Sequence, residues 1–304
     1  MNPAQFPGLK HHRRDLVANG LPQHVHEWHG EAAPRGTALL LHGFMDAGAS
    51  WELVAPLLCG AGFRVLAPDL RGFGDGPRAP AGSYYHFPDY VLDTAEILRA
   101  LVPDDEVLHV VGHSMGGTVA TLFVGTFPER VASLAVLEGI GPPDNAYEIA
   151  PLRMRRWVDD MRRHAGKPPK SIGTMENALT RLRGSHSAVP LEILRDRAAH
   201  LVRPHAGGEE GALAWRFDDL HRSTSPFPFY AKAYEAFARC VTCPVLFVSG
   251  GPEGFHTPDE DERLAAFGNL RRVELGGGHM MHWTRSAELG HALVELMTSA
   301  SPPR

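Results

Sequence analysis

Ser114 is the residue of this chain whose surroundings point most directly to chemistry. It stands at the centre of Gly112-His113-Ser114-Met115-Gly116, after an apolar run that predicts a strand and before a segment that predicts a helix. Glycines on both sides permit a strand-to-helix turn that is too tight for side chains, and such a turn presents the serine hydroxyl above a sheet. The pattern therefore predicts that Ser114 is a nucleophile.

A serine that attacks a carbonyl group needs hydrogen-bond donors for the oxygen that becomes negatively charged. The amide of Met115, at the start of the expected helix, is one candidate donor. The amide of Phe44 is the second, because His42-Gly43-Phe44 ends another apolar run and opens a loop. We expect these two amides to form an oxyanion hole and the side chain of His42 to brace the loop.

A serine hydroxyl is a weak nucleophile unless a base accepts its proton, and imidazole has a suitable pKa. Of the 18 histidines, His279 is the best candidate, since GGGHMMHW lies between the last predicted strand and the last predicted helix. This places it at the carboxyl edge of the sheet, where open parallel sheets hold their chemistry. His282 competes with it, but three glycines before His279 suit a tight loop.

Two carboxylates that lie between the serine and the histidine in the chain compete to orient the imidazole. Glu138 ends the run SLAVLEGIG, and Glu253 follows the run PVLFVSGG. Either could stabilise the protonated imidazole. A carboxylate at the end of an apolar strand should be paired or functional, whereas a loop glutamate can simply be exposed. The residues alone leave both candidates open.

Short apolar runs alternate with helical segments along most of the chain, and this rhythm predicts a parallel sheet covered by helices on both faces. Two further strands, with alternating polarity, are expected in the first 30 residues at the edge of the sheet, which gives eight strands. The apolar runs cover residues 37–43, 63–72, 107–114, 131–141, 244–251 and 270–278. The helical segments cover residues 50–62, 86–102, 115–130, 258–267 and 292–297.

The alternation of apolar runs and helical segments is interrupted between residues 144 and 230. Helical stretches separated by loops are expected there at 147–164, 174–184 and 190–201. We predict that 144–230 is a helical cap inserted after the sixth strand, and that 1–143 and 231–304 form the core. The cap should form one wall of a substrate pocket. The candidate substrate-binding residues are His113, Trp157, Trp215 and Phe227, and the alternative for the cap aromatics is that they form its interior.

Composition excludes several classes of protein. The chain has 304 residues with a formal charge of −5, which does not favour nucleic-acid binding. No apolar run approaches the roughly 18 residues of a membrane helix, and the first residues lack an apolar leader, so we expect a cytoplasmic protein. Cys240 and Cys243 lack further ligands for zinc, so we expect structural thiols and neither a metal nor a cofactor.

The motifs HGF, PDLRGFGDG, GHSMGG, FPERV and GGGHMMHW, in this order, resemble the α/β-hydrolase fold superfamily over about residues 20–298, apart from the cap. The resemblance implies that fold and a serine-histidine-acid mechanism. The usual acid position follows PVLFVSGG and favours Glu253, although aspartate is commoner there. FPERVASLAVLEGIGPP resembles the haloalkane-dehalogenase-like branch, whose glutamate corresponds to Glu138. WRFDDL and SPFPFY resemble serine-hydrolase-like proteins of that branch, so we favour Glu138 slightly and keep Glu253 as the alternative.

We therefore predict a serine hydrolase that cleaves an ester, lactone, thioester or amide of a small, largely apolar substrate through an acyl-enzyme. The resemblance implies that dehalogenases and epoxide hydrolases carry an aspartate where this chain has Ser114, which argues against those activities. Proline iminopeptidases and carbon–carbon bond hydrolases, with the same triad, are the enzymatic alternatives. A ligand receptor without catalysis is the third possibility, because fold does not fix function. The sequence gives no indication of the oligomeric state.

Overall fold

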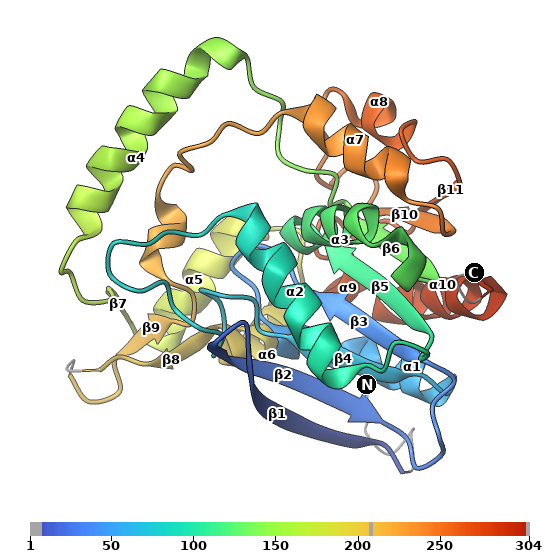
Figure 1. Ribbon diagram of the computed structural model, residues 1–304. Coiled ribbons are helices and arrows are strands. Elements are labelled where there is room, and N and C mark those ends of the chain that lie inside the picture. The colour runs from blue at the N-terminus through green and yellow to red at the C-terminus, as the bar shows by residue number, and fades with distance from the viewer. Residues whose placement is uncertain (1–7, 207–208, 302–304) are drawn as a thin grey trace.

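The computed structural model describes residues 8–206 and 209–301, and its centre is an eight-stranded sheet (Figure 1). The strand order is β1-β2-β4-β3-β5-β6-β10-β11, so the chain crosses over between neighbouring strands several times. In chain order the strands of this sheet are β1 (Lys10–Ala18), β2 (Leu21–His29), β3 (Thr37–Leu41), β4 (Arg64–Pro68), β5 (Leu108–His113), β6 (Ser133–Leu137), β10 (Val245–Ser249) and β11 (Leu270–Glu274).

The sheet is mostly parallel, as the sequence predicts. Strands β1 and β2 form an antiparallel hairpin at one edge, and β2 pairs antiparallel with β4, while all other neighbours are parallel. Every residue of β3, β5 and β6 is buried. Strands covered on both faces are mostly apolar, which is why these segments read as hydrophobic runs with few polar residues.

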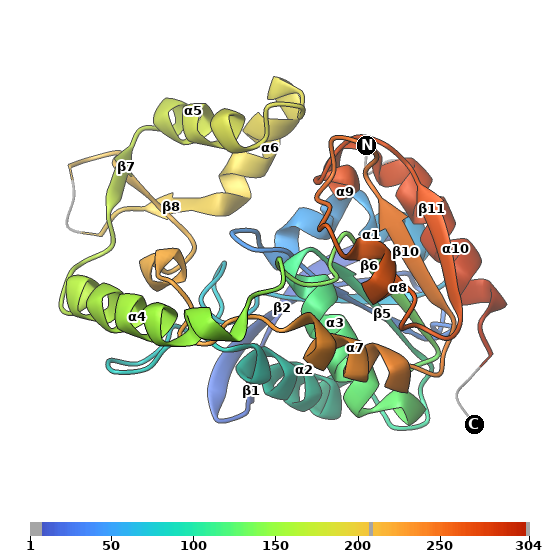
Figure 2. The same ribbon diagram turned by 90° about the horizontal axis from the view of Figure 1, so that it is seen from above.

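Helices cover both faces of the sheet (Figure 2). Side chains alternate along each strand, so Leu39 and Leu41 of β3 join the core under one helical layer and Ala38 and Leu40 join the other. One layer holds α2 (Phe87–Leu101), α3 (Met115–Thr126) and α7 (Ala231–Cys240), and the other holds α1 (Ala55–Gly60) and α10 (Ser286–Ser299). The shorter helices are η2 (Gly48–Leu53), η3 (Pro128–Arg130), α8 (Glu260–Leu264) and α9 (Met281–Thr284).

The segment between β6 and α7, which we call the cap (residues 144–230), contains the expected helices and a small sheet. The helices α4 (Ala150–His164), α5 (Met175–Ser185) and α6 (Leu191–Leu201) begin and end within a few residues of the predicted limits. Two short 3₁₀ helices, η4 (Tyr147–Ile149) and η5 (Asp219–Arg222), are also present. The sequence analysis missed the antiparallel sheet β7-β9-β8, made of Ser171–Gly173, Leu213–Trp215 and Val202–Pro204.

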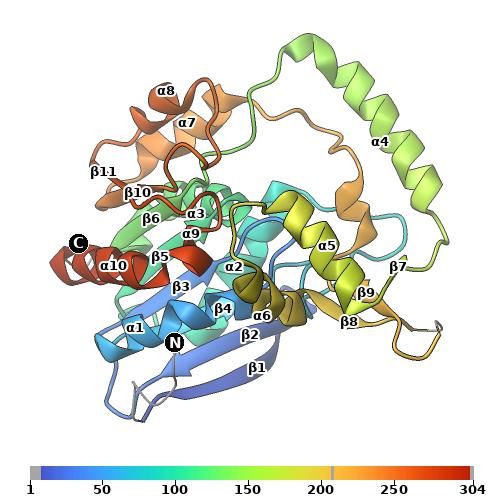
Figure 3. The same cartoon turned by 180° about the vertical axis from the view of Figure 1, so that it is seen from behind.

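The cap contacts the core through α6, and α4 lies at the outer rim of the cap (Figures 2 and 3). Glu52 of η2 pairs with Arg197 and accepts a 3.1 Å hydrogen bond from His200, both on α6. Burial opposes the charge of Glu52, but these partners outweigh it and lower its pKa to about 2. By contrast, none of the 15 residues of α4 is buried. The cap is therefore fixed through α6 and loosely packed at α4.

Among residues 8–206 and 209–301, no helix is both long and apolar enough to cross a membrane. Cys59, Cys240 and Cys243 are free thiols, two of them buried. Burial raises the pKa of Cys59 and Cys243 to about 12, so these two are packed as inert thiols.

Candidate active site

Ser114 occupies a strained turn between β5 and α3. Its φ of 52° lies in a region that L-residues rarely adopt. A Cβ on Gly112 would overlap the carbonyl of Gly116, and a Cβ on Gly116 would overlap the carbonyl of Leu41 at the end of β3. Only glycine fits at both positions, which is the physical reason for the G-x-S-x-G pattern. The turn leaves Ser114 half-buried at the N-terminus of α3.

Three side chains from distant parts of the chain meet at this turn. Nε2 of His279 lies 3.0 Å from Oγ of Ser114, and Nδ1 of His279 lies 2.8 Å from Oε2 of Glu138. His279 enters from the loop after β11, and Glu138 follows β6 directly. The chain therefore holds a hydroxyl, an imidazole and a carboxylate in one continuous series of hydrogen bonds.

The carboxylate of Glu138 is completely buried and fully hydrogen-bonded. Oε1 accepts a 2.6 Å bond from the amide of Gly250, and Oε2 accepts a 2.7 Å bond from the amide of Phe255 as well as the bond from His279. The φ of Glu138 is 46°, so this residue too has a strained backbone. Buried carboxylates are tolerated only with such partners, and backbone strain of this kind concentrates at functional sites.

Glu253 does not reach His279, and the alternative acid of the sequence analysis is not supported by the structure. It is exposed on the loop after β10, the same loop whose Gly250 and Phe255 amides hold Glu138. A Cβ on Gly254 would overlap Oε1 of Glu138. The backbone of this loop is thus wrapped around the Glu138 carboxylate, and the side chain of Glu253 is left pointing to solvent.

The two expected oxyanion donors belong to segments that lie next to Ser114. Met115 is the first residue of α3, and Gly43, immediately before Phe44, approaches so closely that a Cβ there would be 3.1 Å from Cβ of Ser114. Neither the Phe44 nor the Met115 amide donates a hydrogen bond within the described part of the chain. Met45, the next residue of this loop, also has a positive φ, of 59°.

His42 braces the loop that carries Phe44. Its Nδ1 donates to the carbonyl of Gly43 at 2.8 Å, and its Nε2 accepts from the amide of Leu70 at 3.0 Å. Both ring nitrogens are therefore engaged with the backbone. This arrangement leaves His42 no lone pair for a proton from Ser114.

His113, expected as a substrate-binding residue, lies in the interior instead. It is 1% exposed, and its Nε2 lies 2.8 Å from the carbonyl oxygen of His279. Its position directly before Ser114 suggests contact with substrate, but successive residues of a strand point to opposite faces. The side chain therefore supports the site from behind.

The three cap aromatics are placed differently from one another. Trp157 lines a cavity of about 500 Å³ with Tyr84, Tyr85 and Arg78, and neither Ser114 nor His279 is among its described lining residues. Trp215 does not line it: it is buried and stacks on Phe217 at 5.7 Å between ring centroids, so it belongs to the interior of the cap. Phe227 is 63% exposed.

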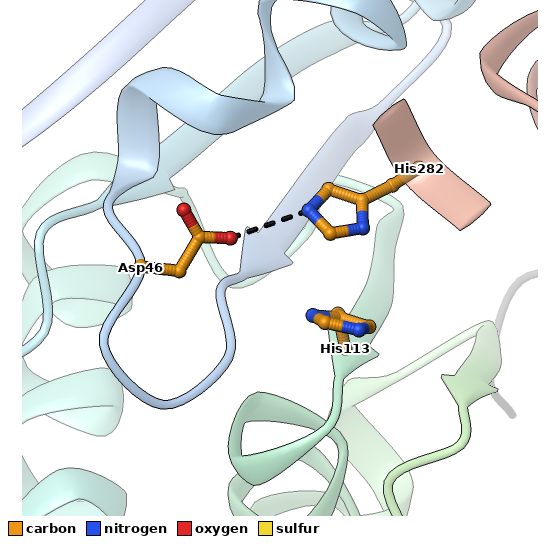
Figure 4. Close-up of side chains that lie close together, drawn as sticks. All are labelled: Asp46, His113 and His282. Atoms are coloured by element: carbon orange, nitrogen blue, oxygen red, sulfur yellow. Dashed lines mark hydrogen bonds and ion pairs between the residues drawn. The ribbon is translucent and has the colours of Figure 1, made fainter. Parts of the chain in front are cut away.

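A buried cluster of Asp46, His113 and His282 lies next to the Ser114–His279–Glu138 series, and the sequence analysis missed it (Figure 4). Nε2 of His282 lies 3.2 Å from Oδ2 of Asp46, and the ring of His113 lies 4.3 Å from that of His282. Burial lowers the pKa of both histidines. One donor atom from each of the three residues lies within 4.8 Å of the others, a spacing that a metal ion could use. His113 and His282 flank the motif residues Ser114 and His279, which is the signal that could have revealed the cluster.

The comparisons with known proteins agree with this fold. A family described as the alpha/beta hydrolase fold matches residues 38–286. The chain belongs to this family, and it is a hydrolase. The class is thus fixed by most of the chain and not by one motif.

Three individual proteins illustrate what the chain is similar to. The chain is 23% identical to a serine hydrolase-like protein of Dictyostelium discoideum over 277 residues, 85% of this chain and 74% of the relative. It is 26% identical to epoxide hydrolase A of Mycobacterium tuberculosis, over 94% of this chain and 97% of the relative. The thioesterase domain from the curacin biosynthetic pathway has a similar fold, with a TM-score of 0.80 and 23% identity over 94% of this chain and 99% of that one.

Proposed function

We propose that this hydrolase is a serine hydrolase that cleaves an ester, lactone, thioester or amide of a small, largely apolar substrate. The observation that carries the proposal is the hydrogen-bonded series Ser114–His279–Glu138, with distances of 3.0 and 2.8 Å. A serine whose hydroxyl faces an imidazole, itself oriented by a buried carboxylate, is activated for attack on a carbonyl carbon.

The reaction would proceed in two halves. Oγ of Ser114 bonds to the carbonyl carbon while its proton passes to Nε2 of His279, and Glu138 stabilises the resulting imidazolium through Nδ1. The amides of Phe44 and Met115 hold the negative oxygen of the tetrahedral intermediate. His279 then gives its proton to the leaving group as the bond breaks. Water, deprotonated by the same imidazole, then bonds to the acyl carbon, and the proton returns to Oγ of Ser114 as its bond to that carbon breaks.

An apolar substrate is supported by the side chains that surround the two reacting groups. Phe44 is 46% exposed beside the proposed oxyanion hole, and Phe255 is 40% exposed with its ring 5.7 Å from that of His279. Exposed aromatic rings near a nucleophile favour an apolar acyl or alcohol group. We further propose that the cap, including Trp157 and Phe227, limits the size of the substrate.

Epoxide opening is not proposed, although one relative is named an epoxide hydrolase. Attack on an epoxide carbon by the hydroxyl of Ser114 would form an ether, and an ether cannot be released by the addition of water to a carbonyl. Proline iminopeptidase and carbon–carbon bond hydrolase activities use the same three groups and remain the alternatives. A cytoplasmic location remains our expectation, in keeping with three free cysteines.

A fluorophosphonate probe tests the proposal, because it forms a stable adduct only with an activated serine. We expect a single adduct on Ser114 in the folded protein, and none in Ser114→Ala or after heat unfolding. Turnover of p-nitrophenyl esters of increasing acyl length would then define the size of the pocket, and a proline-terminated amide would detect the peptidase alternative. Folded protein that forms no adduct on Ser114 would refute the proposed function.

A further inference from the structure

We infer that His113 is a positioning residue that fixes the loop of His279 against the turn of Ser114. His282 and Asp46 extend this support to the loop of Phe44, so that one buried cluster joins all three segments of the site. The inference rests on the proposed function, because it assigns His113 a role in holding the groups of that mechanism. It concerns side chains that make no contact with substrate.

The direction of the hydrogen bond from His113 is fixed by chemistry. The carbonyl oxygen of His279 can only accept, so Nε2 of His113 must donate across the 2.8 Å that separates them. His113 is buried, and burial lowers its pKa well below the usual value, so the ring is neutral. Its proton therefore stays on Nε2. The side chain of His113, the residue before Ser114, thus donates a hydrogen bond to the main chain of His279.

The loop of His279 needs such a contact. Gly276, Gly277 and Gly278 precede the histidine, and all three have a positive φ, between 69° and 83°. Glycine loses more conformational freedom than any other residue when it is ordered, and these three have no side chain with which to pack. The loop is anchored on its far side by the 3.0 Å bond from the Gly278 amide to the carbonyl of Gly250. On the side of Ser114, the anchor at His279 itself is His113.

His282 and Asp46 hold His113 from below, as Figure 4 shows. The His282 ring packs on the His113 ring at 4.3 Å with an angle of 41°, and its Nε2 bonds to Asp46 at 3.2 Å. Asp46 is two residues from Phe44, and its other oxygen accepts from the amide of Ala47 at 2.9 Å and from the hydroxyl of Ser50. All three members of the cluster are at most 3% exposed. A displacement of His113 would therefore shift the segments that carry Ser114, His279 and Phe44.

The same three residues could instead bind a metal ion, since their donor atoms lie within 4.8 Å of one another. The hydrogen bonds engage one nitrogen of each ring, while Nδ1 of His113 and Nδ1 of His282 have no hydrogen-bond partner among the described residues. Oδ2 of Asp46 already faces Nε2 of His282, and Nε2 of His113 is committed to the carbonyl of His279. Metal binding is therefore an outcome that the experiment must be able to detect.

The experiment compares His113→Gln with His113→Asn. Both amides are neutral and polar, but the glutamine nitrogen reaches the place of Nε2, whereas the shorter asparagine places its nitrogen near that of Nδ1. We expect His113→Asn to lower kcat about 100-fold with KM changed less than about threefold, the cost of a small misplacement of reacting groups. His113→Gln should recover at least about tenfold of this loss. Active-site titration corrects kcat for any inactive fraction.

The matched control is His109, a buried histidine on the same strand whose Nδ1 lies 2.8 Å from Oγ of Ser133, far from the site. His109→Asn should lower the Tm and leave kcat of the folded enzyme unchanged. Hydrogen–deuterium exchange gives a readout that does not depend on activity: His113→Asn should accelerate exchange in residues 276–282 relative to both wild type and His109→Asn. This readout decides the inference even if the wild-type chain proves not to hydrolyse esters.

Two results would overturn the inference. In the first, His113→Asn keeps wild-type kcat and wild-type exchange in residues 276–282, so the cluster is only part of the core. In the second, wild type binds one equivalent of Co²⁺ with a visible d–d spectrum that His282→Gln abolishes, so the cluster is a metal site. Failure of the wild-type chain to react with a fluorophosphonate would refute the proposed function alone.

Discussion

The amide of Phe255 donates a 2.7 Å hydrogen bond to Oε2 of Glu138, the same oxygen that faces Nδ1 of His279 at 2.8 Å. The loop after β10 thus contributes backbone donors, and the carboxylate comes from the neighbouring strand β6. The residues alone could not distinguish Glu138 from Glu253, because each follows a strand at the same edge of the sheet, and the resemblance favoured Glu138 only slightly. Only the path of this loop decides which side chain meets the imidazole.

Replacement of the two glutamates should therefore have very different effects. Glu138→Gln keeps the size of the side chain but removes the charge that stabilises the imidazolium, so we expect kcat to fall about 10³–10⁴-fold. Glu253→Gln changes an exposed side chain and should leave kcat within about twofold. Ester hydrolysis by both variants, with circular dichroism as the test of folding, checks this. Equal losses in the two variants would contradict the assignment.

Gly254 should be as important as the carboxylate it touches. A Cβ at this position would overlap Oε1 of Glu138, so Gly254→Ala must push the carboxylate or the loop aside. We expect kcat to fall about 10–100-fold, as for other small displacements of reacting groups. Gly268→Ala is the control, because nothing lies within 4 Å of the Cβ it would add. Wild-type activity in Gly254→Ala would show that the loop adapts without cost.

Acid should destabilise the fold through buried histidines. Burial lowers the pKa of His109 from 6.5 to about 4 and that of His221, stacked between Phe73 and Tyr85, from 6.5 to about 3. Between these values each ring binds a proton only in the unfolded chain. The free energy of unfolding should then fall as the pH falls below 6.5, by up to about 1.4 kcal/mol per pH unit for each histidine.

Denaturant titrations at pH 7.5, 6.0 and 5.0 measure this dependence. Glu52, whose pKa is lowered to about 2, should add to the loss only below about pH 4.5, where the unfolded chain takes up its proton. His109→Gln removes one of these buried histidines, so its stability should change less steeply with pH than that of wild type. An identical dependence of stability on pH in the variant would show that His109 does not contribute to it.

Limited proteolysis should begin in α4. None of its residues is buried, so local unfolding of this helix costs little free energy, and it offers trypsin Arg155 and Arg156 on its surface. Arg99 is a fair comparison, since its side chain is 77% exposed but its helix α2 packs on the core through Tyr90, Ile97 and Leu98. We expect cleavage after the arginines of α4 well before cleavage after Arg99. Mass spectrometry of the first fragments would show the opposite order if α4 is held firmly.

The strands of the main sheet and the cap helices could be predicted because each is long enough to show its period. The strands β7, β8 and β9 have three residues each, too few for any alternation to appear. The elbow of Ser114 is a local motif, whereas the contact between Asp46 and His282 joins residues 236 positions apart. A contact between residues so far apart depends on how two loops pack against each other, and no pattern of neighbouring residues in the sequence predicts it. The same reason explains why His113 was assigned to the substrate and Trp215 to the pocket.

Of the four non-glycine residues with positive φ among residues 8–206 and 209–301, three are Met45, Ser114 and Glu138. Backbone conformations of this kind cost about 1–3 kcal/mol each. These conformations lower the stability of the folded chain, and the three residues lie at or beside the proposed active site. Ser114→Gly should accordingly have a higher Tm than Ser114→Ala, because glycine adopts a positive φ more readily than alanine. Both variants lack the nucleophile, so activity does not enter the comparison. Selection for turnover and selection for heat resistance would then pull this single position in opposite directions.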